Sequence, residues 1–307
     1  MKRTTDYGLR TTGLPTDLPR LLCPEWEDYA LLDSGGGQKL ERFGPYTLVR
    51  PEPAARWRPT LARQVWEEAH AILRDRGKTR YEWEFRRPID ASWLLHYRAL
   101  TFRVRLETSR HVGVFPENAA HWDWIAAQIQ AAGRPIRVLN LFGYTGLATL
   151  AAAQVGAAVT HVDAAAAALK LARENQSLSG LADHPIRWLE DDALKFVQRE
   201  ARRGSQYDGI VMDPPRFGHG PQGQVWEFFE HFPLLCAACR GILSSQPLFV
   251  VATVYALNVP PASLRQNLDS ITHGLGGDLT VGELATRELG AGRVIPNALF
   301  GRWAARP

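Results

Sequence analysis

The hydrophobic positions beyond residue 110 alternate between short apolar runs and helical repeats. Such alternation is typical of parallel strands joined by right-handed crossover helices. The predicted strand–helix pairs are 137–141 with 147–155, 158–163 with 164–179, 186–189 with 193–202, 207–212 with 225–241, and 247–253 with 263–271. Two further runs, 281–288 and 298–304, enclose a glycine turn and predict a hairpin with an antiparallel last strand. The predicted fold class is α/β: a doubly wound, Rossmann-like, mostly parallel sheet with a reversed C-terminal edge hairpin.

The first 110 residues follow a different pattern. Residues 1–20 are polar and contain two prolines, so they are predicted to form an arm or loop. Strand-like runs at 29–43, 46–50, 83–85 and 100–106 surround a helical pattern over 59–75, and a further helix is predicted over 118–132. The chain is therefore expected to hold a smaller strand-rich N-terminal domain, 1–110, and an α/β domain, 111–307.

The composition is that of an ordinary globular protein, with 45% hydrophobic and 22% charged residues. No apolar run reaches the length of a membrane span, and no apolar stretch follows the basic N-terminus, so a cytoplasmic protein without membrane contact is expected. Cys236 and Cys239 lie at helical spacing, but no second pair accompanies them. They are interpreted as buried small side chains, and no metal site is expected from the cysteines or histidines.

The positive charge is concentrated at the N-terminal end. Residues 1–110 hold 20 basic and 15 acidic side chains, whereas residues 111–307 hold 16 and 17. Five of the ten tryptophans also lie in the first segment. Arginines among aromatic residues suit phosphates and stacked bases, which favours contact with nucleic acid. A solvated, arginine-rich face of a β-rich domain is the alternative.

A glycine-containing turn follows the first strand of the α/β segment, in Leu139-Asn140-Leu141-Phe142-Gly143-Tyr144-Thr145-Gly146. The next predicted strand ends at Asp163, twenty residues after Gly143. An α/β sheet holds a nucleoside in this way, with backbone at the turn and a carboxylate on the ribose. The turn lacks the three glycines that a pyrophosphate demands, which suits S-adenosylmethionine (SAM). Asp192 follows the third strand, where it could accept from an adenine amino group, cap the next helix, or both.

The fourth predicted strand ends in Asp213-Pro214-Pro215-Arg216-Phe217. The carboxylate of Asp213 and the carbonyl of Pro214 could accept both hydrogens of a conjugated amine and favour its pyramidalisation. The two prolines stiffen the loop, and Phe217 could stack on a flat target. Asp213, Pro214 and Phe217 are therefore the candidate catalytic residues. A plain proline turn that leaves a strand is the alternative.

These motifs resemble class I SAM-dependent methyltransferases, and among them the bacterial 23S ribosomal RNA large-subunit methyltransferases of the cytosine-5 and guanine-N7 type. The matching stretches also include His111-Val112-Gly113-Val114-Phe115-Pro116-Glu117-Asn118 and Ala172-Arg173-Glu174-Asn175. The resemblance implies a methionine side at Asn140, Phe142, Gly143 and Thr145, a ribose contact at Asp163 and an adenine contact at Asp192. The candidate cofactor-binding set is Phe115, Glu117, Asn140, Phe142, Gly143, Thr145, Gly146, Asp163, Ala164, Asp192, Ala193 and Asp213.

Two features depart from those relatives. Cytosine-5 enzymes of this kind carry a cysteine just after the fifth strand, whereas this chain has Val251-Ala252-Thr253-Val254-Tyr255. The N-terminal segment also does not resemble the small RNA-binding domain of many relatives, so it could bind RNA or complete the cofactor pocket. The leading hypothesis is SAM-dependent methylation of a base nitrogen in RNA, with ribosomal RNA as the expected substrate. The alternatives are a protein amide or small-molecule amine as acceptor, or a SAM- or RNA-binding protein without turnover.

Overall fold

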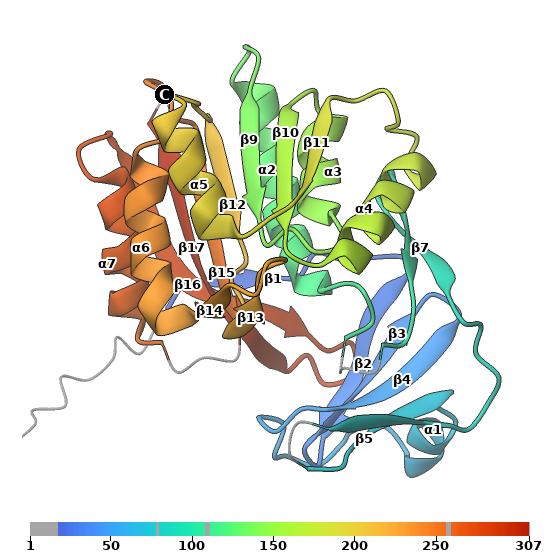
Figure 1. Ribbon diagram of the computed structural model, residues 1–307. Helices are drawn as coiled ribbons and strands as arrows, with labels where there is room; N and C mark the ends of the chain where they lie inside the picture. Colours follow the sequence, from blue (N-terminus) through green and yellow to red (C-terminus); the bar gives the residue numbers. More distant parts are fainter. Residues whose placement is uncertain (1–17, 78–79, 108–110, 256–258, 307) are drawn as a thin grey trace, which may run out of the picture.

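An eight-stranded sheet forms the centre of the protein in the computed structural model, which describes residues 18–77, 80–107, 111–255 and 259–306 (Figure 1). The strand order is β1-β16-β17-β15-β12-β9-β10-β11. Only β17 runs antiparallel to its neighbours. The α/β class and the reversed hairpin are therefore confirmed. The strands are β1 (Arg20–Leu22), β9 (Arg137–Leu141), β10 (Ala158–Asp163), β11 (Ile186–Glu190), β12 (Gly209–Met212), β15 (Phe249–Tyr255), β16 (Gly277–Arg287) and β17 (Val294–Ala305).

Helices cover both faces of this sheet, because alternate residues of each buried strand point to opposite sides. Leu139 and Leu141 pack with one group of helices, and Val138 packs with the other. One face carries α5 (Ala193–Arg202), α6 (Phe228–Arg240) and α7 (Pro261–Thr272); the other carries α2 (Ala119–Ala131), α3 (Leu147–Gln154) and α4 (Ala166–Leu178). No described helix is long and apolar enough to cross a membrane.

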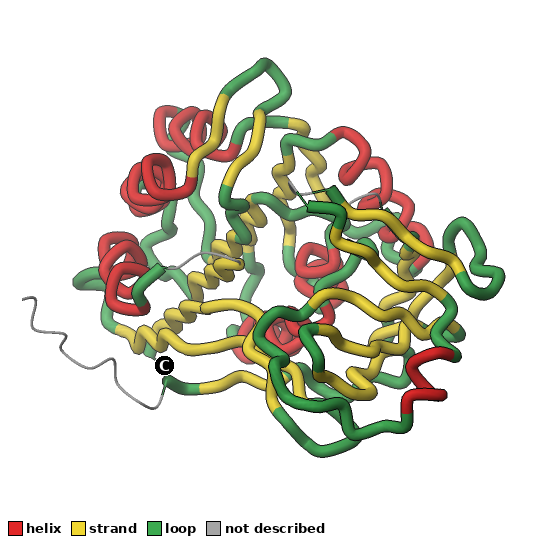
Figure 2. Tube along the Cα trace, turned by 90° about the horizontal axis from the view of Figure 1, so that it is seen from below, coloured by secondary structure: helices red, strands yellow, loops and turns green. Residues whose placement is uncertain are grey.

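A five-stranded sheet from the N-terminal segment lies beside the large sheet (Figures 1 and 2). Its strands, in spatial order, are β2 (Tyr29–Gly35), β3 (Gln38–Phe43), β4 (Tyr46–Pro51), β5 (Ala71–Asp75) and β6 (Tyr81–Phe85). A separate hairpin, β7 (Trp93–Tyr97) with β8 (Leu100–Val104), packs on α4.

The predicted helix over 59–75 is wrong. Only α1 (Arg63–Glu67) is helical, and Ala71–Asp75 form a strand between β4 and β6. The helix α1 buries none of its residues, whereas Ala71, Ile72 and Leu73 are fully or nearly buried in the sheet. Strand pairing and burial therefore outweigh the local helical pattern.

Two other element boundaries differ from the prediction. Residues 1–17 of the predicted arm lie outside the described residues, and Arg20 already belongs to β1, which pairs with β16 in the large sheet. The predicted helix 225–241 begins only at Phe228, because residues before it form β14 (Val225–Glu227), the partner of β13 (Phe217–His219). The Glu227 carboxylate then caps α6 by accepting from the Glu230 amide at 2.9 Å.

A buried ionic network fastens the N-terminal sheet to the C-terminal hairpin. Arg293, in the turn between β16 and β17, donates to Glu288 at 2.6 Å and to Asp33 at 2.9 Å. The Asp33 and Glu288 side chains are fully buried. Ser34 also donates to Glu288, at 2.5 Å. One arginine thus compensates two buried carboxylates where the N-terminal sheet meets the C-terminal hairpin.

Candidate active site

A cavity of about 780 Å³ opens where the carboxyl ends of the parallel strands meet the N-terminal sheet. Ligands of open α/β sheets bind at this edge. The N-terminal segment contributes part of the wall through β3, β4 and the residue after β4: Lys39, Arg50, Pro51 and Glu52 line the cavity. The sequence left open whether this segment binds RNA or completes the cofactor pocket. The structure shows that it lines the cavity.

The turn after β9 has a strained backbone. Phe142 and Tyr144 both adopt left-handed conformations, with φ of 55° and 49°, a state that costs a non-glycine residue on the order of 1 kcal/mol. Gly143 lies between them, and a Cβ at this position would lie 2.6 Å from Nδ1 of His161. Asp163 stabilises the turn by accepting from the Tyr144 amide at 2.8 Å. The glycine and the aspartate that the sequence singled out thus form one unit.

Glu117, Asp163 and Asp213 line the cavity; Glu117 is buried, and the two aspartates are partly exposed. Burial raises the pKa of all three. The effect is largest at Asp213, where burial and the neighbouring Glu117 raise the pKa to about 8. The positive charges of Lys39 and Arg50 oppose this rise at Glu117. A cationic ligand would favour the ionised form of all three groups.

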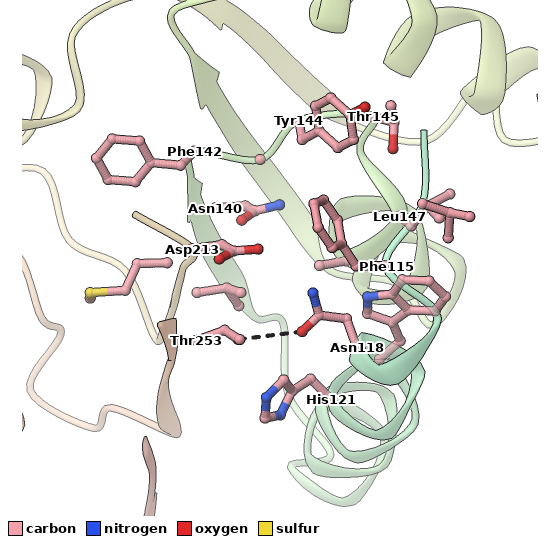
Figure 3. Close-up of a pocket in the computed structure, with 16 residues that line it drawn as sticks. Phe115, Asn118, His121, Asn140, Phe142, Tyr144, Thr145, Leu147, Asp213 and Thr253 are labelled. Carbon is pink, nitrogen blue, oxygen red and sulfur yellow. Dashed lines mark hydrogen bonds between the residues drawn. The ribbon is translucent and has the colours of Figure 1, made fainter. Parts of the chain in front are cut away.

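Asn118 connects these acids to the end of β15. Its side-chain amide donates to the Tyr255 hydroxyl at 3.1 Å, and its carbonyl oxygen accepts from the Thr253 hydroxyl at 3.3 Å. Figure 3 shows Asn118 between Thr253 and Phe115, with Asp213 above it. The Phe115 and Tyr255 rings are in contact, with centroids 4.9 Å apart. This network fixes the side of the cavity next to Asp213.

The structure brings most predicted site residues together. The large cavity is lined by Phe115, Glu117, Phe142, Asp163, Ala164, Asp192, Ala193, Asp213 and Pro214. An adjoining pocket of about 60 Å³ is lined by Asn140, Gly143 and Thr145 (Figure 3). Asp192 also caps α5, accepting from the Lys195 amide at 2.9 Å, so both of its predicted roles are compatible with its position.

Neither pocket is lined by Gly146 or Phe217. Gly146 instead is the N-cap residue of α3, and Phe217 is 62% exposed.

Several cavity residues were not predicted. Tyr144 and Asn118 lie inside motifs quoted from the sequence, and Tyr255 is the last residue of β15, so position alone could have indicated them. Lys39 and Glu52 carry no such signal. They reach the cavity only because the N-terminal sheet docks beside the large one.

The parallel sheet, the strained turn and the acidic residues at successive strand ends define a nucleoside-binding α/β protein. A family model for S-adenosylmethionine-dependent methyltransferases matches residues 54–230. The chain belongs to this family, and its cofactor is SAM.

Solved structures agree with this assignment. A SAM-dependent methyltransferase from Agrobacterium tumefaciens is 44% identical, with a TM-score of 0.90 over 100% of this chain and 98% of its own. A protein from Streptococcus mutans, described as a candidate SAM-dependent methyltransferase, is 17% identical, with a TM-score of 0.69 over 90% of this chain and 75% of its own. The second likeness shows the fold alone.

Curated relatives match over a shorter stretch. Ribosomal RNA large subunit methyltransferase I of Shewanella denitrificans is 43% identical over 105 residues, which is 34% of this chain and 24% of the relative. The protein of the same name in Klebsiella pneumoniae (strain 342) is 38% identical over 106 residues, with the same coverage. The chain thus matches about a quarter of the length of these relatives.

The cavity fits SAM on chemical grounds. SAM carries a sulfonium and an ammonium group, and the cavity is lined by Glu117, Asp163 and Asp213, whose ionised forms a nearby cation would favour. Its apolar wall includes Phe142 and Trp226, whose ring centroids are 4.7 Å apart. Within the described ranges, no group of three or more His, Cys, Asp or Glu side chains could hold a metal ion.

Proposed function

We propose that this protein transfers a methyl group from SAM to a base nitrogen of RNA, and that its substrate is ribosomal RNA in the cytoplasm. One observation carries the proposal: the Asp213-Pro214 edge lies in the same cavity as Asp163 and the strained turn. An acceptor and a cofactor can therefore meet in one enclosed space. The names of the matched relatives support RNA as the substrate class.

In this proposal the predicted cofactor residues keep their roles. Asp163 binds the ribose hydroxyls and Asp192 the adenine, while the turn of Phe142 and Gly143 approaches the methionine part. Glu117 is buried next to Asp213, so its negative charge attracts the positively charged end of the cofactor to this part of the cavity.

When bound, SAM supplies a methyl group already activated by a positive sulfur, so positioning provides much of the acceleration. The Asp213 carboxylate and the Pro214 carbonyl accept the hydrogens of the target nitrogen and hold its lone pair toward the methyl carbon. Bound SAM would supply the methyl carbon for the new nitrogen–carbon bond and would leave with the electron pair of its sulfur–carbon bond. The nitrogen then loses one proton, which Asp213 accepts.

The cysteines support a nitrogen acceptor over a cytosine C5 atom. Attack on C6 of a cytosine needs a thiolate at the cavity, but none of Cys23, Cys236 and Cys239 lines it. Cys236 and Cys239 are buried in the core on α6, where burial raises the pKa of both thiols. The sequence-based interpretation of these two as buried small residues agrees with this position.

Binding of SAM at neutral pH is expected to release about one proton. Asp213 has a pKa of about 8 in the free protein, so it is largely protonated at pH 7, and a nearby cation favours its ionised form. Calorimetric titrations in buffers of different ionisation enthalpy measure this release. The Asp213→Asn variant should lose most of this proton release. Binding of S-adenosylhomocysteine, whose sulfur is neutral, should release fewer protons than binding of SAM. Equal heats in every buffer would contradict the placement of the cation beside Asp213.

The substrate class is tested by transfer of labelled methyl from SAM to an extract of cells that lack this protein, with RNA, protein and small molecules counted separately. We expect label in the RNA fraction, removed by ribonuclease and absent with Asp213→Asn. Label confined to protein would instead favour an amide acceptor, and label in small molecules an amine. Either result would overturn the RNA proposal and leave the family assignment intact.

A further inference from the structure

The β13–β14 hairpin follows the Asp213 loop and has two different faces. Gly218 pairs with Trp226, so these two residues share the inner face. Trp226 is buried, and its indole N–H donates to the Pro215 carbonyl at 2.7 Å. Both residues line the cavity. The inner face therefore forms part of the cavity wall and supports the loop that holds Asp213.

The outer face carries an exposed aromatic ring beside the entrance. Phe217 is 62% exposed and Val225 is 55% exposed. Phe217 does not line the cavity, although its neighbours Arg216 and Gly218 do. The ring thus lies at the entrance, outside the space that would enclose a target base. Its predicted stacking on the target base stays a prediction, and its position suggests a different contact.

Positive charge accompanies this ring. Arg216 is exposed, lines the cavity and forms no salt bridge with any residue that the structure describes. His219 shares this strand face with Phe217, is also exposed, and lines the cavity. Glu227 lies opposite Phe217, but its carboxylate accepts from the Glu230 amide. An exposed ring next to an arginine is the combination that binds single-stranded nucleic acid through a base and its phosphate.

The proposed function explains why such a surface is needed. A base that is methylated inside a cavity must leave its stack, so the nucleotides next to it stay outside. We propose that Phe217 stacks on the base adjacent to the target nucleotide, and that Arg216 binds the phosphate between them. The ligand of the outer hairpin face is therefore single-stranded RNA that flanks the methylated site. This inference rests on the proposed function.

The test compares Phe217→Ala with Phe229→Ala in the full-length protein. Phe229 is a matched control, because it is 55% exposed on α6 and does not line the cavity. The affinity for a fluorescent single-stranded RNA of about twelve nucleotides is measured by anisotropy with S-adenosylhomocysteine present. Phe217→Ala should weaken binding about tenfold, and Phe217→Trp should restore it. Phe229→Ala should bind like the wild type.

Two further measurements distinguish the phosphate contact of Arg216 from the base contact of Phe217. Arg216→Gln should lower the slope of log Kd against log salt by about one, whereas Phe217→Ala should leave the slope unchanged. In single-turnover methyl transfer to ribosomal RNA from cells lacking this protein, Phe217→Ala should need about tenfold more RNA for half of its maximal rate, whereas Phe229→Ala should behave like the wild type.

Two results for Phe217→Ala would overturn the inference, and the activity of the wild type shows whether the proposed function fails with it. If Phe217→Ala binds RNA as tightly as Phe229→Ala does, Phe217 makes no contact with the flanking base. If Phe217→Ala keeps its affinity but loses single-turnover rate, Phe217 acts on the target base itself. With either of these results for Phe217→Ala, the proposed function survives as long as the wild type methylates the ribosomal RNA. If the wild type transfers no methyl to RNA, the proposed function fails as well.

Discussion

Replacing Asp213 with Asn is expected to lower methyl transfer by roughly a hundredfold to ten-thousandfold, the range for loss of a positioned proton acceptor. The substitution keeps the shape of the side chain but removes the oxygen that accepts the proton. SAM affinity should change by no more than about threefold. The carboxyl has a pKa of about 8, so at neutral pH it must lose a proton before it attracts the sulfonium, and its net contribution to binding is small. Single-turnover transfer and calorimetric binding measure the two effects separately.

Asp183→Asn is the matched control for this variant. Asp183 lies on an exposed turn before β11 and does not line the cavity. The same chemical change there should leave both rate and affinity unaltered. If Asp213→Asn lost SAM binding and transfer together, its carboxyl would serve chiefly to hold the cofactor. Transfer at the wild-type rate would remove Asp213 from the reaction altogether.

Arg293→Ala is expected to destabilise the protein by about 3 to 5 kcal/mol, the usual cost of leaving a buried charge without its partner. Arg293 is the partner of Asp33 and Glu288, whose side chains are both fully buried. It also donates to the Ser34 and Arg58 carbonyl groups, so its loss breaks contacts on β2 and on the loop between β4 and α1. Urea unfolding followed by circular dichroism measures the change.

Arg306→Ala is the comparison for this experiment. Its ion pair with Asp278 is 2.7 Å long but exposed on both sides, and such pairs contribute little. Its unfolding midpoint should match that of the wild type. If Arg293→Ala also matched the wild type, the buried network would not be what fastens the N-terminal sheet. Because that sheet supplies Lys39 and Glu52 to the cavity, Arg293→Ala should also weaken ligand binding in the cavity.

Most of the α/β fold could be predicted from the sequence, because strands buried on both faces form short apolar runs and the helices between them keep a helical period. The prediction failed at residues 59–75, where the apolar spacing of Ile72 and Leu73 suits a helix but their burial comes from strand pairing. The pairing of β1 with β16 joins residues more than 250 positions apart. No local pattern can indicate such a contact.

The candidate site likewise contains residues that the sequence could indicate and residues that it could not. Asp163 and Asp213 could be predicted because each follows a buried strand, and parallel strands bring their carboxyl ends to one edge. Lys39 could not, since it reaches the cavity through the docking of a second sheet. Phe217 was placed beside the target from its position in the loop. That placement stays a prediction: Phe217 is 62% exposed and does not line the cavity, although Arg216 and Gly218 on either side of it do.

The most direct test of the central claim is to find the atom that receives the methyl group. Ribosomal RNA from cells that lack this protein is incubated with the enzyme and with SAM that carries a deuterated methyl group, then digested to nucleosides and analysed by mass spectrometry. The predicted result is one deuterated nucleoside methylated on a base nitrogen, absent with Asp213→Asn. A label on C5 of a pyrimidine, a label on a ribose oxygen, or RNA without label would contradict the account.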